Sequence, residues 1–480
     1  MTTLVFVHGW SVTDTDTYGS LPQRVQAQAN AAGLSFAIAD IWLSEYVTFD
    51  DRVTMDDLVR ALDHALRGLN LADGRFACIT HSFGGPVVRS WLRAQREHPK
   101  DFSTLKLSHL VMLAPANFGS ALAQLGKGVL GKVKAWWNGV EPGQRVLDWL
   151  ELGSAGSLSL NLDHIHGNDP LRDGRFLFVL TGDRPDRSLY DFLNSYTGEV
   201  DSDGVVRTAA ANLNACHAVL RAPADADAGP IDTLQLQLTR APRSAFKLIA
   251  GASHVGTRQG IMASDQPATA EAIVRCLRVA DATGYHALCD AFDAENALRD
   301  ASKAELDPVG PFPPHVTIHD ACSMLIVRLA DDRGEALTDT AFLLTAGAPA
   351  RPDWLPQGFM VDRQANHRSA AVVTMYLNHA LLAGDERVPD PRDPQKTLRD
   401  ARIAHRPYGC QLQPPDLQGL VHHALASSAA GDDFMPLFGA HQTTVLDVVL
   451  PRKIHEGLFR LTRTLTPESF AKPVPGAVIE

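Results

Sequence analysis

The sequence predicts an α/β fold for residues 1–300 and a β-rich second domain for the C-terminal part of the chain. In the first part, short apolar segments alternate with helix-like stretches, which is the pattern of a mostly parallel sheet covered by helices. A proline-rich segment then separates this part from a series of strand-like segments with glycine and proline between them. With 480 residues the chain is also too long for one ordinary hydrophobic core, so we expect two domains.

Six short, mostly apolar segments are the expected strands of the first domain. They are Leu4–Val7, Phe36–Ile41, Phe76–Thr80, His109–Leu113, Phe176–Leu180 and Phe246–Ala250. Helix-like stretches fall between them at Met55–Leu69 and Gly85–Gln95, and Thr269–Val279 is the expected final helix.

The segment 301–314 is rich in proline and predicts a stiff linker that breaks the helical pattern. We expect residues 315–480 to form a β-sandwich-like domain, because turn residues separate its strand-like segments. The clearest expected strands are Ser323–Leu329, Ala341–Thr345, Ala371–Leu377 and Thr443–Leu450.

Composition excludes several classes of function. The formal net charge of -11 argues against a nucleic-acid partner and against attachment to anionic lipid by bulk charge alone. The six cysteines are widely spaced without a CxxC pair, which favours a reducing compartment, and we predict neither a metal site nor a cofactor. No cleavable signal peptide or membrane-spanning run is apparent, so we expect synthesis in the cytoplasm, with export by a signal-independent route as a hypothesis.

A serine lies at a sharp turn between the third expected strand and the following helix. Residues 79–85 read I-T-H-S-F-G-G, and this strand, turn and helix with a serine at the apex is typical of a nucleophile elbow. A serine hydroxyl becomes a good nucleophile only when a nearby base takes its proton. We therefore predict that Ser82 is a nucleophile, the alternative being that it only caps the helix.

Such a nucleophile needs backbone amides that stabilise an oxyanion. One donor is normally the amide that follows the nucleophile, here Phe83, and the other comes from a loop after an early strand. Gly9 and Trp10 follow the first expected strand, so the Trp10 amide is the second candidate.

The base and the acid are expected further along the chain, in the order serine, acid, histidine. His254 follows the last expected strand and is the candidate base. Two aspartates compete as the acid. Asp183 follows the strand Phe176–Leu180 directly, whereas Asp203 precedes Gly204 in a segment where a tight turn would aim its carboxylate inward.

Several motifs together resemble the lipase and esterase members of the α/β-hydrolase fold family, including GPI-inositol-deacylase-like and bacterial lipase-like serine hydrolases. They are V-H-G at 7–9, H-S-F-G-G at 81–85, P-A-N-F-G-S at 115–120, S-D-G-V-V at 202–206 and the late His254. The resemblance covers roughly residues 1–280 and implies that Asp203 is the acid. Thr80 departs from the family pattern, where glycine is usual, and Ala116–Asn117 replaces a frequent His-Arg pair.

The segment 119–156 is a candidate lid or cap insertion over the site. It carries Trp136, Trp137 and Trp149 among other apolar residues, with glycines between them. Such an insertion would expose apolar side chains to a lipid interface and contribute an acyl pocket, the alternative being a fixed cap whose tryptophans belong to the core.

These features predict a serine hydrolase that cleaves carboxylic esters of lipid-like substrates through Ser82, His254 and Asp203. A thioesterase, amidase or acyltransferase would use the same three residues, because the fold does not select the acyl acceptor. A non-catalytic binding module on a hydrolase scaffold is the third alternative.

Overall fold

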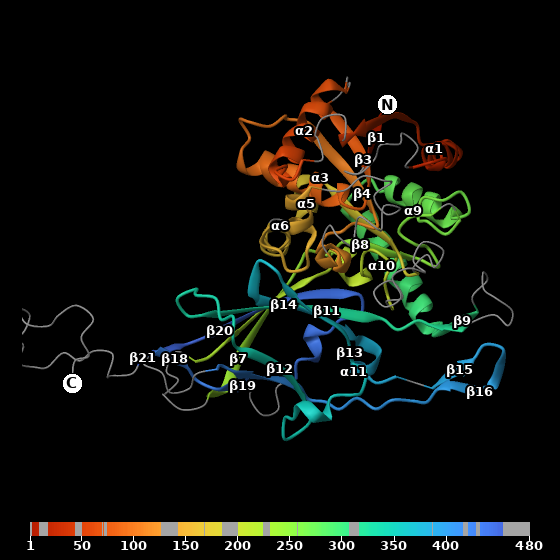
Figure 1. The fold of residues 1–480 in the computed structure, drawn as a ribbon. Helices are drawn as coiled ribbons and strands as arrows, with labels where there is room; N and C mark the ends of the chain where they lie inside the picture. Colours follow the sequence, from red (N-terminus) through yellow and green to blue (C-terminus); the bar gives the residue numbers. More distant parts are fainter. Residues whose placement is uncertain are drawn as a thin grey trace, which may run out of the picture.

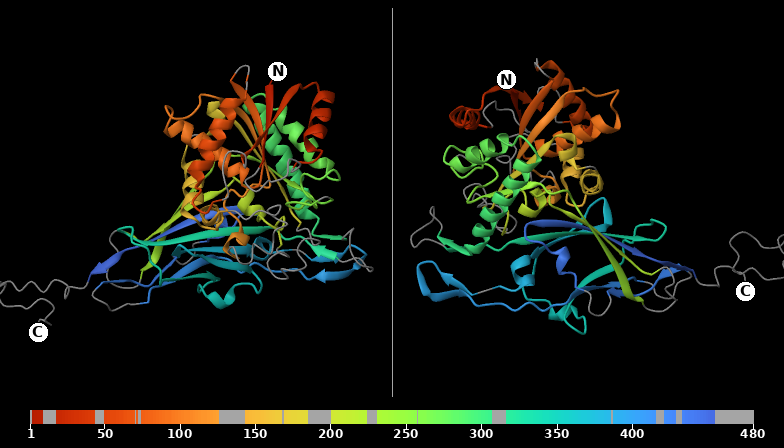
Figure 2. Two further views of the ribbon diagram at one scale, coloured as in Figure 1. Left: turned by 45° about the horizontal axis from the view of Figure 1, so that its top comes forward. Right: turned by 180° about the vertical axis from the view of Figure 1, so that it is seen from behind.

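The computed structural model describes residues 2–8, 18–43, 50–69, 71, 74–125, 143–167, 169–184, 200–223, 231–256, 258–306, 316–385, 387–415, 421–428 and 433–454. Figures 1 and 2 show two parts, an α/β part and a β-rich part on which it sits. None of the helices in these residues is long and apolar enough to cross a bilayer.

The α/β part is built on a six-stranded sheet in the order β2-β1-β3-β4-β5-β8. All neighbouring strands pair in parallel. The strands are β1 (Thr2–His8), β2 (Phe36–Trp42), β3 (Arg75–His81), β4 (Lys106–Leu113), β5 (Phe176–Gly182) and β8 (Ala245–Ile249). All six strands predicted for this sheet are therefore confirmed.

Helices cover both faces of this sheet (Figure 1). On β1, Val5 and Val7 belong to the hydrophobic core of one face, and Leu4 and Phe6 belong to the core of the other. One face packs against α2 (Met55–Gly68), α3 (Gly84–Glu97), α5 (Gln144–Leu150) and α6 (Ala155–His166). The other packs against α1 (Leu21–Ala31), α9 (Pro267–Leu277) and α10 (Ala282–Ala301). This two-sided burial explains why the strands read as continuous apolar runs.

The last helix of the α/β part differs from the prediction. The expected final helix corresponds to α9, but α10 follows it after a short break and is 20 residues long. The side chain of Asp281 caps α10 by accepting a hydrogen bond from Gly284 N, at 2.8 Å.

The β-rich part contains a nine-stranded sheet in the order β12-β17-β19-β7-β6-β20-β11-β14-β13. Its strands are β6 (Cys216–Arg221), β7 (Ile231–Arg240), β11 (Cys322–Asp331), β12 (Ala341–Ala346), β13 (Met360–Asn366), β14 (Ser369–Asn378), β17 (Tyr408–Gln413), β19 (Ala426–Ser428) and β20 (Gln442–Leu450). One core cluster contains side chains from strands near both ends of this order, such as Leu344 of β12 and Met375 of β14. The sheet therefore encloses a core in the manner of a sandwich.

Two strands of this sheet come from the segment that we assigned to the first domain. β6 pairs in parallel with β20 from Cys216↔Thr444 onward, and β7 pairs antiparallel with β6. Placing the whole of residues 1–300 in the α/β domain was therefore wrong for this hairpin. The partner of β6 in this sheet, β20, lies more than 200 residues later in the chain, beyond the reach of local sequence pattern.

The remaining elements are short and complete the two parts. They are η2 (Ala121–Leu125), η3 (Pro170–Asp173), α8 (Thr208–Ala211), β9 (Ala304–Leu306), β10 (Val316–Ile318), η4 (Pro352–Trp354), α11 (His379–Ala383), β15 (Val388–Asp390), β16 (Asp393–Arg399), β18 (Val421–His423), η5 (Met435–Leu437) and β21 (Arg452–Ile454).

Candidate active site

Ser82 lies in a strained turn between β3 and α3. Its φ is 54°, in the left-handed region that residues other than glycine seldom adopt. Its amide donates a hydrogen bond to Leu113 O at the end of β4, at 2.9 Å. Gly85 keeps the start of α3 close to the next loop, because a Cβ there would come within 3.0 Å of Pro115 Cβ. The turn is therefore fixed by the sheet beneath it.

A continuous chain of hydrogen bonds runs from Ser82 through His254 to Asp203. Ser82 Oγ donates to His254 Nε2 at 3.0 Å, and His254 Nδ1 donates to Asp203 Oδ2 at 2.8 Å. The histidine is 1% exposed and the aspartate 0% exposed, whereas Ser82 is partly accessible. The structure thus brings together the predicted nucleophile, base and acid in a geometry suited to proton transfer.

The backbone of residues 201–206, which we call the acid loop because it carries the predicted acid, holds the Asp203 carboxylate. Its Oδ1 accepts hydrogen bonds from Val205 N at 2.9 Å and Val206 N at 2.7 Å. Gly204 makes the turn with a φ of 93°, and His254 N donates to Asp203 O at 3.0 Å. The tight turn aims the carboxylate inward, toward the histidine.

Asp183, the competing acid, has a different set of partners. Its Oδ1 accepts a hydrogen bond from Gly251 N at 2.7 Å, and its Oδ2 accepts one from Arg299 Nε at 2.7 Å. Asp183 therefore connects the end of β5 to α10, whereas the carboxylate that bonds His254 is that of Asp203.

The structure adds His81, to which the sequence reasoning gave no role. His81 Nε2 donates to His254 O at 3.0 Å, and the two rings lie 4.7 Å apart. His81 is the last residue of β3 and directly precedes Ser82. The same strand end therefore positions both the serine and the backbone of the histidine.

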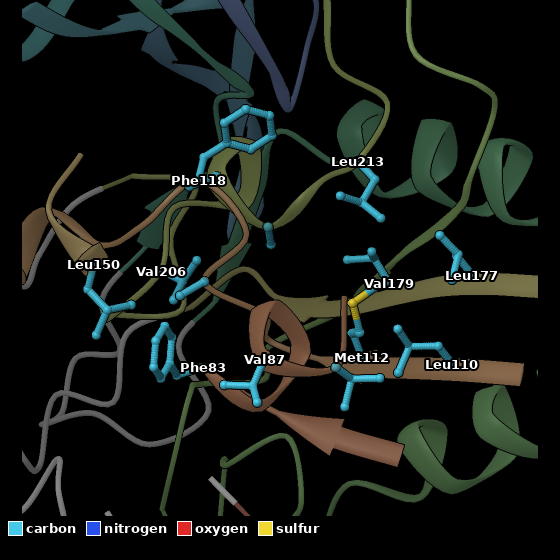
Figure 3. Packing of buried hydrophobic residues seen from close by; sticks show 14 of the residues in the cluster. Phe83, Val87, Leu110, Met112, Phe118, Leu150, Leu177, Val179, Val206 and Leu213 are labelled. Atoms are coloured by element: carbon cyan, nitrogen blue, oxygen red, sulfur yellow. The ribbon is translucent and has the colours of Figure 1, made fainter. Parts of the chain in front are cut away.

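The Phe83 amide directly follows Ser82 at the beginning of α3, where Phe83 is the N-cap residue. The first amides of a helix have no acceptor within the helix and carry partial positive charge, which suits them to bind an oxyanion. The Phe83 ring is buried and belongs to the same apolar cluster as Leu150 and Val206 (Figure 3). Trp10, the other expected donor, lies outside the described residues.

Both ends of the candidate lid insertion pack beside this site. The half-buried Trp149 on α5 meets the Phe83 ring edge-on, with ring centroids 5.2 Å apart. At the other end, Ser120 Oγ donates to Val205 O in the acid loop at 2.6 Å. Trp136 and Trp137 lie outside the described residues. Of the three expected tryptophans, Trp149 is thus the one that the structure places next to the elbow.

The β-rich part contacts the acid loop through strands of the nine-stranded sheet. No motif in the sequence predicts this arrangement. The buried Arg207 forms an ion pair with Asp362 of β13, and its guanidinium lies 4.3 Å from the centre of the Tyr376 ring. Tyr376 donates its hydroxyl to Asp201 O at 2.7 Å. Cys322 N donates to the Asp201 carboxylate at 2.8 Å. Two strands of the nine-stranded sheet thus hold Asp201, two residues before Asp203, by its backbone and by its carboxylate.

In the described part of the chain, no group of three or more His, Cys, Asp or Glu side chains is arranged to hold a metal ion. All six cysteines are buried free thiols.

No protein-family model and no curated protein matches the chain. Among solved structures, phospholipase PlaB from Legionella pneumophila is 37% identical, with a TM-score of 0.82 and 97% of each chain covered. A structure of the same protein in complex with thio-NAD gives 36% identity, a TM-score of 0.80 and the same coverage. A Bacillus licheniformis lipase, BlEst2, is 21% identical over 44% of this chain with a TM-score of 0.32, too low to support any argument.

The similarity to PlaB includes the β-rich part as well as the α/β part, because it spans almost the whole of both chains. It supports the expected lipase-like class of hydrolase, whereas the GPI-inositol-deacylase-like resemblance stays a prediction. At this identity and coverage, the chain belongs to the family of the Legionella pneumophila phospholipase PlaB.

Proposed function

We propose that the protein is a serine hydrolase that cleaves carboxylic esters of lipids, with phospholipids as the first substrate class to test. The observation that carries this proposal is the hydrogen-bond chain from Ser82 Oγ to His254 Nε2 and from His254 Nδ1 to Asp203. The similarity to a phospholipase over 97% of both chains supports lipids as the source of the ester.

In the proposed reaction, Ser82 Oγ attacks the ester carbonyl while His254 Nε2 takes the hydroxyl proton. Asp203 keeps the Nδ1 proton of His254 in place and stabilises the imidazolium that forms. The Phe83 amide, with the Trp10 amide as the second donor, stabilises the oxyanion. His254 then protonates the leaving alcohol, and a water molecule, deprotonated by His254, hydrolyses the acyl-serine.

The insertion 119–156 is proposed to form part of the acyl site. Trp149 lies against Phe83, so an acyl chain that extends from Ser82 on this side would meet an aromatic wall. Trp136 and Trp137 are proposed to extend the same apolar surface toward a lipid interface.

A substrate panel tests this proposal against its alternatives. The panel contains phosphatidylcholine, phosphatidylglycerol, phosphatidylinositol, a p-nitrophenyl ester, a thioester and an anilide, each with the wild type and Ser82→Ala. We expect fatty-acid release from phospholipid, lost in Ser82→Ala. Faster turnover of the thioester would favour a thioesterase over the proposed lipase, and faster turnover of the anilide would favour an amidase. Acyl transfer to an added alcohol would favour an acyltransferase.

A nicotinamide dinucleotide is a further ligand that we propose to test, because a 36% identical relative is described in complex with thio-NAD. We expect NAD to raise the melting temperature of the wild-type protein in a concentration-dependent way. A melting temperature that stays constant up to millimolar NAD would contradict this.

A further inference from the structure

A cleft rich in arginine lies between α3, α6 and the segment from η3 to β5. Its volume is about 70 Å³, and we call it the arginine cleft. Its charged and titratable lining consists of Arg89, Arg93, Arg96, Asp163, His164, Asp173 and Arg175. The proposed nucleophile, base and acid are not among its lining residues.

Three of the arginines share one face of α3. Arg89, Arg93 and Arg96 are spaced i, i+4 and i+7, so the helix presents them side by side. The fourth arginine, Arg175, faces them from just before β5. Four guanidinium groups along one cleft repel one another unless negatively charged groups lie close to them.

The three outer arginines have carboxylate partners. Arg96 pairs with Asp163 at 2.7 Å and Arg175 with Asp173 at 3.1 Å. Arg93 pairs with Glu97 at 2.9 Å. Each of these arginines is about a third or more exposed, so its ion pair is weak and can be rearranged around a ligand.

Arg89, the innermost arginine, has no carboxylate partner in the described part of the chain. It is 5% exposed, and its Nη1 donates to the neutral amide oxygens of Asn117 at 2.9 Å and Asn161 at 3.0 Å. Its Nη2 is buried and has no hydrogen-bond partner among the described residues. Proteins normally pair a buried charge, because an uncompensated one costs several kcal/mol. The positive charge at the base of the cleft thus has no direct ion-pair partner among the described residues, and Asp163 acts on it only at longer range.

His164 adds a second buried polar atom without a partner. Its Nε2 makes no hydrogen bond to any described residue. Burial, and then the nearby Arg89, lower the pKa of His164 to about 3, so the ring is neutral at pH 7. A neutral imidazole donates a hydrogen bond from one ring nitrogen, which makes His164 a suitable neighbour for an oxyanion.

We propose that the arginine cleft binds a phosphate group, with Arg89 as its buried anchor and Arg96 and Arg175 closing over it from the rim. A phosphate presents several acceptor oxygens, and guanidinium groups match them with pairs of parallel N–H donors. The single unpaired charge of Arg89 and the small volume of the cleft fit one phosphate group and exclude a polyanion such as nucleic acid. The inference does not rest on the proposed hydrolase function.

The test measures phosphate binding by the full-length Ser82→Ala protein, in which lipid hydrolysis cannot interfere. Inorganic phosphate is titrated calorimetrically against sodium chloride at the same ionic strength. In a second arm, phosphatidylcholine vesicles with and without phosphatidate are used in a flotation assay. Phosphate binding identifies a soluble ligand, and binding to phosphatidate vesicles alone identifies a lipid headgroup.

The variants Arg96→Gln and Arg175→Gln separate binding from folding, because both residues lie at the rim, whereas Arg89→Gln risks the packing around Asn117. Arg351→Gln is the matched control, since Arg351 pairs with an aspartate two residues away, as Arg175 does, but in the β-rich part. We expect each rim variant to weaken binding by about tenfold or more and Arg351→Gln to leave it unchanged within about twofold. Binding in neither arm, or equal binding by Arg175→Gln and Arg351→Gln, would overturn the proposal.

Discussion

Asp201 and His441 join the two parts of the molecule directly beside the acid loop. His441 Nδ1 lies 2.9 Å from the Asp201 carboxylate, and His441 Nε2 lies 2.9 Å from Asp300 of α10. Both Asp201 and His441 have positive φ, 57° and 52°, although neither is glycine. An ion pair thus holds these two strained residues together. One of them, Asp201, lies only two positions before Asp203.

The charge on His441 predicts how stability depends on pH. Burial disfavours the imidazolium, but its pairing with Asp201 and Asp300 outweighs burial and raises the pKa of His441 to about 10. In the unfolded chain the pKa returns to about 6.5, so folding binds a proton between these values. The stabilisation is therefore complete below about pH 6.5 and is lost as pH rises toward 10.

Urea unfolding at several pH values between 6 and 10 checks this for the wild type and His441→Asn. We expect the free energy of unfolding of the wild type to fall more steeply with pH than that of the variant. Parallel pH profiles for the two proteins would show that His441 does not carry the expected charge.

The same ion pair is expected to affect catalysis through the position of Asp203. In His441→Gln, the loop that carries Asp201 loses one of its anchors, and a displacement of about 1 Å at a catalytic group costs roughly 100-fold in rate. We expect kcat to fall by about 10- to 100-fold, with KM for a soluble ester nearly unchanged. His217→Gln is the matched control, because His217 pairs with Asp447 at 2.9 Å inside the nine-stranded sheet. An equal loss of kcat in both variants would indicate general destabilisation.

Asp203→Asn and Asp183→Asn separate the acid from its competitor. Asparagine at 203 removes the acceptor that fixes the His254 tautomer, so we expect kcat to fall by about 10⁴-fold while the fold is kept. Asparagine at 183 weakens the ion pair with Arg299 and is expected to lower the melting temperature, with a much smaller effect on kcat. Ester hydrolysis and thermal unfolding of the two variants check this, and the reverse ranking of kcat would assign the acid role to Asp183.

Trp149 is expected to contribute to recognition of the acyl chain. Its ring packs against Phe83 beside Ser82, so Trp149→Ala removes apolar surface that a long chain would contact. We expect kcat/KM for a p-nitrophenyl ester with a long acyl chain to fall by about tenfold or more, and that for the acetate ester to change little. Trp149→Phe keeps an aromatic ring and serves as the control. Equal losses for both esters would point to a role in folding.

The sequence predicts best what depends on neighbouring residues. The six parallel strands and the elbow at Ser82 follow from short apolar runs and a local turn, and His254 follows from its place after the last strand. The acid stayed open on these grounds, because Asp183 directly follows an expected strand, whereas Asp203 precedes Gly204 in a segment where a tight turn would aim its carboxylate inward. Their difference is set by Arg299, which lies 116 residues beyond Asp183 and pairs with it.

Contacts between distant segments left no comparable pattern in the sequence. In the folded chain, buried and less buried residues alternate along β6. The sequence does not predict, however, that β6 pairs with β20. Likewise, Arg207, Tyr376 and His441 carry no motif, and their positions around the acid loop arise from the packing of the β-rich part against the α/β part.

Labelling with a fluorophosphonate, followed by peptide mass spectrometry, tests most directly whether Ser82 is an activated nucleophile. Such a probe reacts with a serine hydroxyl only where a base activates it and an oxyanion site receives the product. We predict one adduct, on the peptide that contains Ser82, absent in Ser82→Ala and retained in Ser108→Ala, whose serine lies in β4 away from the turn. An unlabelled wild-type protein, or an adduct on another serine, would contradict the proposed role of Ser82.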